Sequence, residues 1–588
     1  MGSGDLISRI YHSFRGVDFR GDEINLVRSP NSLNIWKDYK ETESIRTRPE
    51  MELLKDFNAP VYGVFFYKPA DTEMMLVHSG TRLYKVVGGI KTEIYTGLKA
   101  ARSDAFVFNN LWFFKDGANY LQYDGATIGD VQGYVPTTSI NRKPGGGGNV
   151  ASGGTILEDV NMLSNCRINT FIGDGVSTHF YVDVPYFTGV NPTAPYEDRI
   201  AFIKENYEIK INDVVVYPTS DGSEYTVGIL ATKGEFQISP APPAPLTDGQ
   251  ANVSIKFPVV TNDRRKITNC TLLQVFDNRV FFSGNPDYPN MLWHCSLEDP
   301  TYCSDLDYYN EGLDVAEVKG MVAGNNALWV FKEPSQANTT VFYHTPTIDG
   351  DYGKIYPNTH SSIATGCVGK AINFNDDILF FSDRGMEGIS GDVTSEQVIA
   401  HRSTLVDRKL TAETNYKDMI LEEWEGYLLA FVDNKVYLAD SRSMFTNENN
   451  VEYEWFYWEF DKAITCAKVN NGILYLGTKD GVYTLTDTKS DVECWWVTPK
   501  DKFKNPQYLK TTNKRGCVVE ATGDIDIYAK TEKTDFELIS EHKNITDSFV
   551  CRIKRKKFKD IQLKFYSKTR FSLETATLEC FVGGYIKR

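Results

Sequence analysis

The chain of 588 residues lacks any apolar run as long as the roughly 18–20 residues that a membrane-spanning helix needs. Its N-terminus, from Met1 to Leu6, lacks the basic and apolar regions of a secretory signal. We therefore expect synthesis in the cytoplasm. Signals for helices are also sparse, and the best short candidate is the segment 403–418.

Closely spaced cysteines are missing as well. The ten cysteines are spread singly and none belongs to a CxxC pair, which argues against both a zinc site and a small disulfide scaffold. The nearest approach to a ligand cluster is His294, Cys295 and Cys303, for which ordinary buried positions are the better interpretation. We expect free thiols in a reducing compartment.

Motifs of nucleotide and hydrolase chemistry are absent too. The run Gly145–Gly148 has neither the Lys-Ser/Thr ending of a P-loop nor a flanking strand and helix. No G-x-S-x-G nucleophile elbow occurs. The sequence therefore predicts no cofactor, no metal and no catalytic residues.

Positive charge is scarce overall, since the formal net charge is −15. This argues against a protein that wraps nucleic acid, because such proteins neutralise phosphates with Lys and Arg. From Pro499 to Arg588, however, 20 Lys and Arg face 12 Asp and Glu. The run Arg552–Lys559 contributes most of this local excess. It indicates either a binding patch or an edge strand protected from aggregation by lysines.

What the chain has in abundance is β-hairpins. Six times a short Asn, Asp or Gly turn opens into a strongly apolar, often aromatic run. Asn, Asp and Gly tolerate the positive φ of tight hairpin turns, and β-branched and aromatic residues favour strands. A seventh hairpin is expected upstream, over residues 76–84. The six copies are 107–113, 275–282, 323–330, 374–381, 431–438 and 469–476.

The spacing of these turns predicts a β-propeller. The first turn residues Asp277, Asn325, Asn375, Asp433 and Asn470 lie 48, 50, 58 and 37 residues apart, and repeats of roughly 40–50 residues are typical of propeller blades. The gap of 168 residues before Asp277 falls to 37 if residues 135–265 are an inserted domain. A series of β-sandwiches is the alternative, since hairpins alone do not prove radial closure.

The predicted fold is therefore all-β: a propeller of about six to eight blades, an inserted β-sandwich and a β-rich C-terminal region. Short alternating strands within the insert favour the sandwich. The N-terminal segment has few alternating runs and indicates an arm that docks on a neighbour or on the chain's own sheets. The expected parts are the arm 1–58, propeller 59–134, insert 135–265, propeller 266–494 and C-terminal region 495–588.

Some propellers hydrolyse sugars, with paired carboxylates at the mouth of the channel. Asp376, Asp377 and Asp383 are candidates here, but acidic residues at hairpin turns are mostly turn formers. The segment Ser382–Ile389 matches only half of the Ser-x-Asp-x-Gly-x-x-Trp box of sialidases. We therefore expect no enzymatic activity.

The N-terminal arm resembles the opening of tailed-phage proteins described as packaged-DNA stabilisation or tail nozzle proteins. The matching segments there are Gly16–Asp18, Arg28–Trp36 and Ile45–Glu50. Further matches are Val77–Tyr84, Phe281–Pro286 and the terminal Gly583–Arg588, so the resemblance spans nearly the whole chain. The insert, with Phe171–Gly175 and Ile238–Pro243, resembles a β-sandwich module of phage tail proteins.

This resemblance implies a structural virion protein of a phage tail, usually six copies to a ring, below the portal and adaptor. It would extend the conduit for double-stranded DNA, help to retain the genome, and be made in the bacterial host. An acidic wall offers phosphates no partners, so DNA would slide past it. Candidates for channel-lining carboxylates are Asp376, Asp377, Glu422, Glu423 and Glu425, although a solvated outer face is the alternative for each.

Two other classes of function stay open at this point. A receptor-binding or glycan-cleaving tail protein would also be rich in strands, and it would gather paired carboxylates beside aromatic side chains. A cellular propeller scaffold would stay monomeric and present one flat binding face. Assembly into a ring separates the nozzle interpretation from both.

Overall fold

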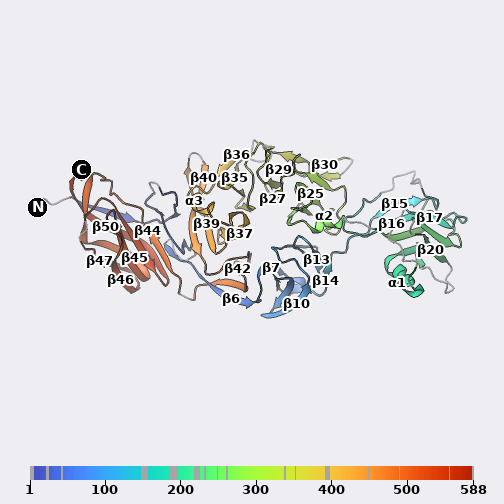
Figure 1. Cartoon of the computed structure of the whole chain (residues 1–588), viewed down its shortest axis with the longest axis horizontal. Helices are drawn as coiled ribbons and strands as arrows, with labels where there is room; N and C mark the ends of the chain where they lie inside the picture. The colour runs from blue at the N-terminus through green and yellow to red at the C-terminus, as the bar shows by residue number, and fades with distance from the viewer. Residues whose placement is uncertain are drawn as a thin grey trace. The chain divides into compact units, whose positions relative to one another are not determined.

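The computed structural model of the chain describes residues 5–585 apart from 22–24, 41–43, 147–156, 185–192, 194, 217–224, 231–233, 248, 260–262, 337–338, 351–352, 391–397, 448–449, 489–490 and 555–556. The regular secondary structure of the described part is nearly all strand (Figure 1). It divides into two compact units, which we call unit 1 (Met1–Ser103 with Ala316–Arg588) and unit 2 (Asp104–Val315).

The chain is a β-propeller, and its blades are four-stranded antiparallel sheets built mostly of consecutive strands. Unit 2 holds two blades, β11 (Asp104–Phe108), β12 (Leu111–Lys115), β13 (Tyr120–Tyr123) and β14 (Ile128–Asp130), then β23 (Leu272–Phe276), β24 (Arg279–Ser283), β25 (Met291–His294) and β26 (Tyr308–Asn310). Unit 1 begins with the blade β7 (Val61–Tyr67), β8 (Met74–Ser79), β9 (Arg82–Val87) and β10 (Ile90–Thr96).

Four further blades complete unit 1. They are β27 (Val318–Gly324), β28 (Ala327–Lys332), β29 (Val341–His344) and β32 (Asn358–His360); β33 (Ala371–Phe374), β34 (Asp377–Ser382), β35 (Gly385–Ser390) and β36 (Val398–His401); β37 (Ile420–Trp424), β38 (Tyr427–Val432), β39 (Lys435–Asn447) and β40 (Asn450–Glu459); and β41 (Cys466–Asn470), β42 (Ile473–Gly477) and β43 (Gly481–Thr486) with the N-terminal β6 (Glu50–Asp56). A side hairpin, β30 (Thr347–Asp349) and β31 (Gly353–Ile355), precedes β32.

The last blade is completed from the other end of the sequence. Strand β6 pairs antiparallel with β43, from Glu50 opposite Thr486 to Asp56 opposite Gly481. Figure 1 shows this blue strand beside the orange ones. A hairpin count cannot find such a strand, because its partner lies more than 400 residues further along the chain.

All six predicted hairpins, and the seventh upstream, are confirmed. In five of the six, both residues of the two-residue loop have positive φ, as at Asn109 (48°) and Asn110 (58°). This is the geometry of a type I′ turn, whose twist matches that of the strands, and Asn, Asp and Gly adopt it at little cost.

One predicted marker belongs to a different turn from the others. The copy at Asp433 joins the second and third strands of its blade, whereas the other five join the first and second. The equivalent turn is Glu425-Gly426, which lies 50 residues after Asn375. Glu425 also has a positive φ, 52°, although glutamate, unlike Asn, Asp and Gly, does not indicate such a turn. The uneven spacings of 58 and 37 therefore have a local cause.

The insert is a β-sandwich. A five-stranded sheet faces a three-stranded one, and the apolar core between them includes Phe171, Ile255, Phe180 and Phe236. An 11-residue helix, α1 (Tyr196–Asn206), was not predicted. The first sheet is β15 (Thr137–Arg142), β16 (Cys166–Phe171), β22 (Val253–Pro258), β18 (Glu208–Ile211) and β19 (Val214–Val216), and the second is β17 (His179–Tyr181), β21 (Glu235–Ser239) and β20 (Thr226–Leu230).

One short stretch inside the range 135–265, residues 161–163, packs with the blades of unit 2 rather than with the sandwich. Met162 and Leu163 are buried in one cluster with Phe113 and Phe282. The side chain of Asn161 donates to the carbonyl of Thr301 at 2.8 Å and accepts from the amide of Cys303 at 3.0 Å. The chain thus leaves the blade, returns to it and leaves again before the main part of the sandwich.

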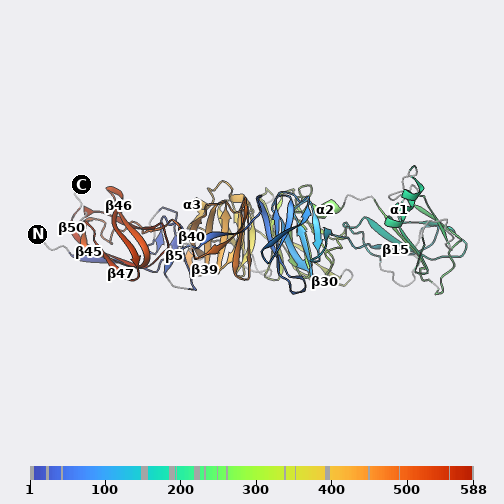
Figure 2. The same ribbon diagram turned by 90° about the horizontal axis from the view of Figure 1, so that it is seen from below.

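The C-terminal region is a set of long strands continuous with a blade. One sheet runs from β37 through β40, then through the short arm strands β4 (Ile35–Lys37) and β5 (Ile45–Thr47), to the last strands of the chain. Figure 2 shows this succession, from β40 and β5 to the red strands. Those are β44 (Cys494–Val497), β45 (Tyr508–Thr531), β46 (Thr534–Ile545), β47 (Ser548–Cys551), β48 (Lys557–Phe558), β49 (Ile561–Ser567) and β50 (Phe571–Tyr585).

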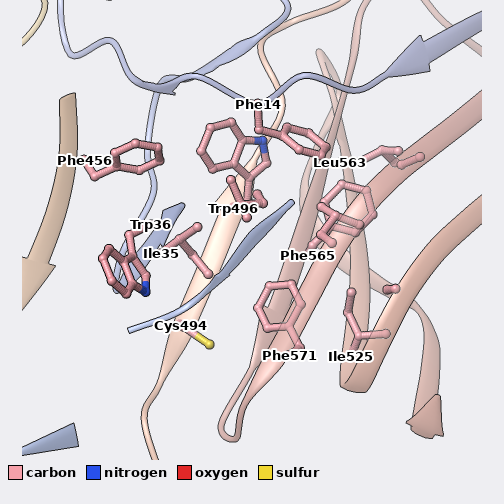
Figure 3. Close-up of a cluster of buried hydrophobic side chains, with 14 of the residues drawn as sticks. Phe14, Ile35, Trp36, Phe456, Cys494, Trp496, Ile525, Leu563, Phe565 and Phe571 are labelled. Carbon is pink, nitrogen blue, oxygen red and sulfur yellow. The ribbon is translucent and has the colours of Figure 1, made fainter. Parts of the chain in front are cut away.

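The predicted arm docks on the chain's own sheets. Its first strand, β1 (Leu6–Tyr11), pairs with β50, and β2 (Gly16–Val17) pairs in parallel with β3 (Arg28–Ser29). In Figure 3, Phe14 and Ile35 of the arm lie between Phe456 of a blade and Phe565 of the C-terminal strands, and Trp36 belongs to the same cluster. The arm therefore supplies part of the core that joins these two regions.

The helix predicted over residues 403–418 is wrong. That segment contains only the one-turn helix α3 (Asp407–Leu410) and a 3₁₀ turn (Tyr416–Asp418). Ser403 and Asp407 bond to each other and to nearby groups, which favours turns over a continuous helix. The described part also contains the short helix α2 (Arg264–Thr268) and a 3₁₀ turn at Pro69–Asp71.

Candidate functional site

The predicted channel-lining residues gather at one face of the blades of unit 1. First strands of neighbouring blades contact each other, β27 with β33, β37 with β41 and β41 with β7. The turns that end these strands therefore lie together, and we call their surface the turn face. It comprises residues 68–73, 325–326, 375–376, 425–426 and 471–472.

Side chains at the turn face connect each blade with the next. Asn373 donates its amide to the carbonyl of Ala323 at 3.2 Å. The Trp424 indole donates to the carbonyl of Gly472 at 3.1 Å. The carboxylate of Glu73 accepts from the side-chain amides of Asn470 and Asn471, at 2.9 and 3.2 Å. These contacts all occur at the same strand ends, which fixes the turns as one surface.

Two of the five predicted carboxylates are engaged in such contacts. Asp377 accepts from Nε of Arg402 at 2.8 Å and from the hydroxyl of Tyr453 at 3.0 Å, so it binds its own blade to the next. Glu422 accepts from the amide of Val469 at 3.1 Å, and its Oε1 lies 3.8 Å from Nζ of Lys468. Their charges are therefore compensated within the structure.

Of the other three, Glu425, in a turn, is also compensated, because it forms an ion pair with Lys40 of the arm. Asp376 and Glu423 are exposed, as are Asp71 and Glu73 on the same face. Within the turn face, Lys68 is a basic neighbour and lies 3.4 Å from Asp71. The solvent-facing charge of these turns and of Glu423 is thus predominantly negative.

A second cluster of titratable groups, which sequence reasoning missed, surrounds His401. Its Nε2 lies 2.6 Å from a carboxylate oxygen of Asp407, and its Nδ1 lies 3.1 Å from one of Glu387. Burial disfavours the imidazolium, but the two carboxylates outweigh it and raise the pKa of His401 to about 10. A protonated imidazole with both nitrogens engaged is a structural cation, not a general base.

The half-matched sialidase segment forms part of this support. Ser382 donates its hydroxyl to Glu387 at 3.2 Å, and Ser403 donates to Asp407 at 2.5 Å. Asp383 is an exposed turn residue whose Oδ1 lies 3.9 Å from Arg384. The serines thus bond to carboxylates rather than to the imidazole, which is not the arrangement of a nucleophile and its base.

A polar cavity of about 380 Å³ lies where the arm meets the last blades and the segment 491–493. Arg48, at its wall, donates to Asn34, to the carbonyl of Pro49 and to the carbonyl of Glu459, at 2.7–2.8 Å. Burial lowers the pKa of Arg48 to about 10. Its bonds hold the arm in place. The carboxylates at the wall are Glu50, Glu459, Asp461, Asp491 and Glu493.

Across the described residues, no three His, Cys, Asp or Glu side chains are arranged to hold a metal ion. His294 instead has Nδ1 at 3.0 Å from the Cys295 carbonyl, and the Cys295 thiol accepts from the amide of Val280. Among the same residues, no helix has the length and apolar character needed to cross a bilayer.

The basic run of the C-terminal region lies at an edge of its sheet. Strands β47 and β48 both pair with β45, and the residues between them include exposed Arg552 and Lys554. Lys557 and Lys559 are exposed as well, whereas Arg555 and Lys556 lie outside the described residues. This placement favours the interpretation as lysine-protected edge strands.

No family model and no curated protein matches the chain. Solved structures resemble it only weakly. BamB from Moraxella catarrhalis is 9% identical over 72% of this chain and 82% of its own, with a TM-score of 0.32. BBS1N in complex with ARL6DN is 10% identical over 75% and 99%, with a TM-score of 0.24. An exo-β-1,3-galactanase from Phanerochaete chrysosporium is 9% identical over 52% and 94%, with a TM-score of 0.21. At these values the strand pairing of the chain itself, not the likeness, defines the fold.

Proposed function

We propose that this chain is a structural subunit of a phage tail that forms a ring around the DNA conduit. By the family resemblance of its sequence, the ring has six copies, lies below the portal and adaptor, and helps to retain and then release the packaged genome. The turn face would line the lumen, and DNA would pass without specific binding.

The observation that carries this proposal is the charge of the turn face. Exposed Glu73, Asp376 and Glu423 face solvent, while the basic side chains nearby, such as Arg402, Lys40 and Lys68, are held in ion pairs. DNA binding requires cations that replace the counterions of the phosphates. A surface of this kind repels the duplex and leaves it free to slide.

The arm and the continuous sheet support a role in resisting mechanical force. The sheet that contains β37–β40 continues through β4 and β5 into β50 and β45, so hydrogen bonds connect a blade directly with the C-terminal strands. For a subunit that holds DNA under pressure, such connections are more important than a mobile catalytic site would be. The chemistry around His401, with each ring nitrogen on a carboxylate, is likewise that of a structural cluster.

Charge reversal in assembled virions tests the proposal. The double variant Asp376→Lys with Glu423→Lys should slow DNA release, and the delay should shrink at high salt, because new phosphate contacts form and are then screened. The matched control is Glu541→Lys, an exposed carboxylate of β46 in the C-terminal region. Release kinetics that are the same in the double variant, the control and the parent would refute the electrostatic role of the turn face.

A further inference from the structure

Two cysteines of the C-terminal region stand directly opposite each other on paired strands. Cys517 of β45 is in register with Cys551 of β47. Opposite Cα atoms of an antiparallel pair lie about 4.5 or 5.5 Å apart, and disulfides span Cα distances of about 4.4–6.8 Å. Either class of pair therefore places these cysteines within bridging distance without backbone movement.

Both side chains point to the same side of the sheet. Cys517, Val519 and Cys551 are buried, whereas the intervening pair, Val518 and Val550, is 39% and 51% exposed. Side chains alternate between the faces of a sheet, so the two thiols share the buried face. Both belong to the apolar core of the C-terminal region, and both are free.

The two thiols are chemically unequal. A hydrogen bond from Cys517 lowers the pKa of Cys551, burial opposes this, and a second bond from Ser540 adds to it. The same bond, together with burial, raises the pKa of Cys517. The thiolate is the reactive form of cysteine, so Cys551 is the better nucleophile of the pair.

We propose that Cys517 and Cys551 form a redox-sensitive pair, reduced in the cytoplasm and closed to a disulfide by a small-molecule disulfide such as oxidised glutathione. The Cys551 thiolate attacks one sulfur of the oxidant, whose S–S bond breaks and releases one thiolate. Cys517 then loses its proton to solvent and attacks the Cys551 sulfur, which releases the second thiolate. The oxidant is reduced to two thiols, and two protein thiols become one disulfide.

Access to the pair comes from the edge of the sheet. Strand β47 has four residues and lies at an edge, where its described partner is β45. Short edge elements open locally at low cost, which exposes Cys551 without global unfolding. The disulfide would connect β47 to β45 and close a loop of residues 517–551, which contains the hairpin of β45 and β46. This inference is independent of the proposed role in the phage tail.

Mass spectrometry of the full chain tests the pair. The protein is incubated with excess oxidised glutathione at pH 8, with and without sub-denaturing urea. Free thiols are then alkylated in a denaturant, and the protein is digested without reduction. We expect a peptide that links Cys517 to Cys551 in at least one condition and that disappears with dithiothreitol. Isolated buried thiols such as Cys367 and Cys494 should remain alkylated.

Two variants sharpen the result. Cys580→Ser alters a neighbouring buried thiol of the same core and should leave the linked peptide intact, whereas Cys551→Ser should remove it. Oxidation should raise the unfolding midpoint of the parent and not that of Cys551→Ser. Full alkylation of both cysteines in every condition, a stable glutathione adduct without a bridge, or a link from Cys517 to Cys580 would overturn the proposal.

Discussion

Arg28 of the arm donates two hydrogen bonds to the carboxylate of Glu454, from Nε at 2.8 Å and from Nη2 at 2.7 Å. The Glu454 side chain is fully buried, and that of Arg28 is 9% exposed. Arg28 also stacks 4.2 Å over the ring of Phe445. This bidentate pair attaches β3 of the arm to β40 of a blade.

Removal of Arg28 should therefore be costly, because it leaves the buried carboxylate with only Arg15, whose Nη1 lies 3.9 Å away. We expect Arg28→Ala to lower the free energy of unfolding by about 3–5 kcal/mol. Urea denaturation followed by tryptophan fluorescence measures the loss. In a Glu454→Gln background the same substitution should cost much less, because no buried carboxylate then loses its partner. Equal costs in the two backgrounds would contradict the pairing.

A substitution at Gly16 tests, through a steric clash, whether the arm packs closely against β40. Its φ is +136°, and a Cβ there would lie 2.1 Å from the carbonyl oxygen of Trp455. We expect Gly16→Ala to destabilise the protein by about 3 kcal/mol and to expose the arm to proteases. The control is Gly88→Ala, also at positive φ (+56°) but with no atom within 4 Å. It should cost about 1 kcal/mol, from backbone strain alone. Similar melting temperatures for the two variants would show that the arm does not dock as described.

The His401 cluster predicts a pH dependence of stability. Its pKa of about 10 in the folded protein is raised above the unfolded value of about 6.5. The contribution of His401 should be complete below pH 6.5 and should be lost as the pH rises towards 10, by an amount on the order of a few kcal/mol. The difference in unfolding free energy between the parent and His401→Gln should shrink over this window. A difference that is constant from pH 6 to pH 10 would contradict a charged imidazole at neutral pH.

The insert can be excised in two ways with different expected results. Replacing residues 137–155 and 166–258 by short Gly/Ser linkers removes the sandwich but keeps Asn161, Met162 and Leu163 in the blade core. This variant should stay soluble and melt cooperatively. Replacing the whole range 135–265 also removes these residues and should melt at lower temperature. If the shorter excision aggregates and the longer one does not, the packing of residues 161–163 in the blade is misassigned.

The sequence predicted those features, above all the hairpin turns, that depend on residues close together in the chain. The type I′ turns at Asn109 and Asp277 require positive φ. Asn and Asp tolerate that conformation, so they predict the turns directly. Glu425 adopts the same conformation, but glutamate does not indicate it. The sequence pattern therefore places the marker of this blade at Asp433, one turn too late. The helix α1 was missed because its apolar residues form no clear stripe, and Pro195 precedes it.

Contacts between distant segments could not be predicted in this way. Nothing in residues 50–56 indicates that they pair with β43, or that Arg28 meets Glu454. Among the five predicted lining residues, Asp376 and Glu423 are exposed, and their place in a channel stays a prediction. Charge and turn position could not reveal that Asp377 is bound to Arg402, because that ion pair depends on how blades meet.

The most direct test of the account is the oligomeric state of the chain in isolated phage tails, imaged by electron microscopy. We predict a closed ring of copies, six by resemblance, around a central channel, with the turn face towards the lumen. A single copy per tail, or copies placed as peripheral spikes away from the DNA path, would contradict it.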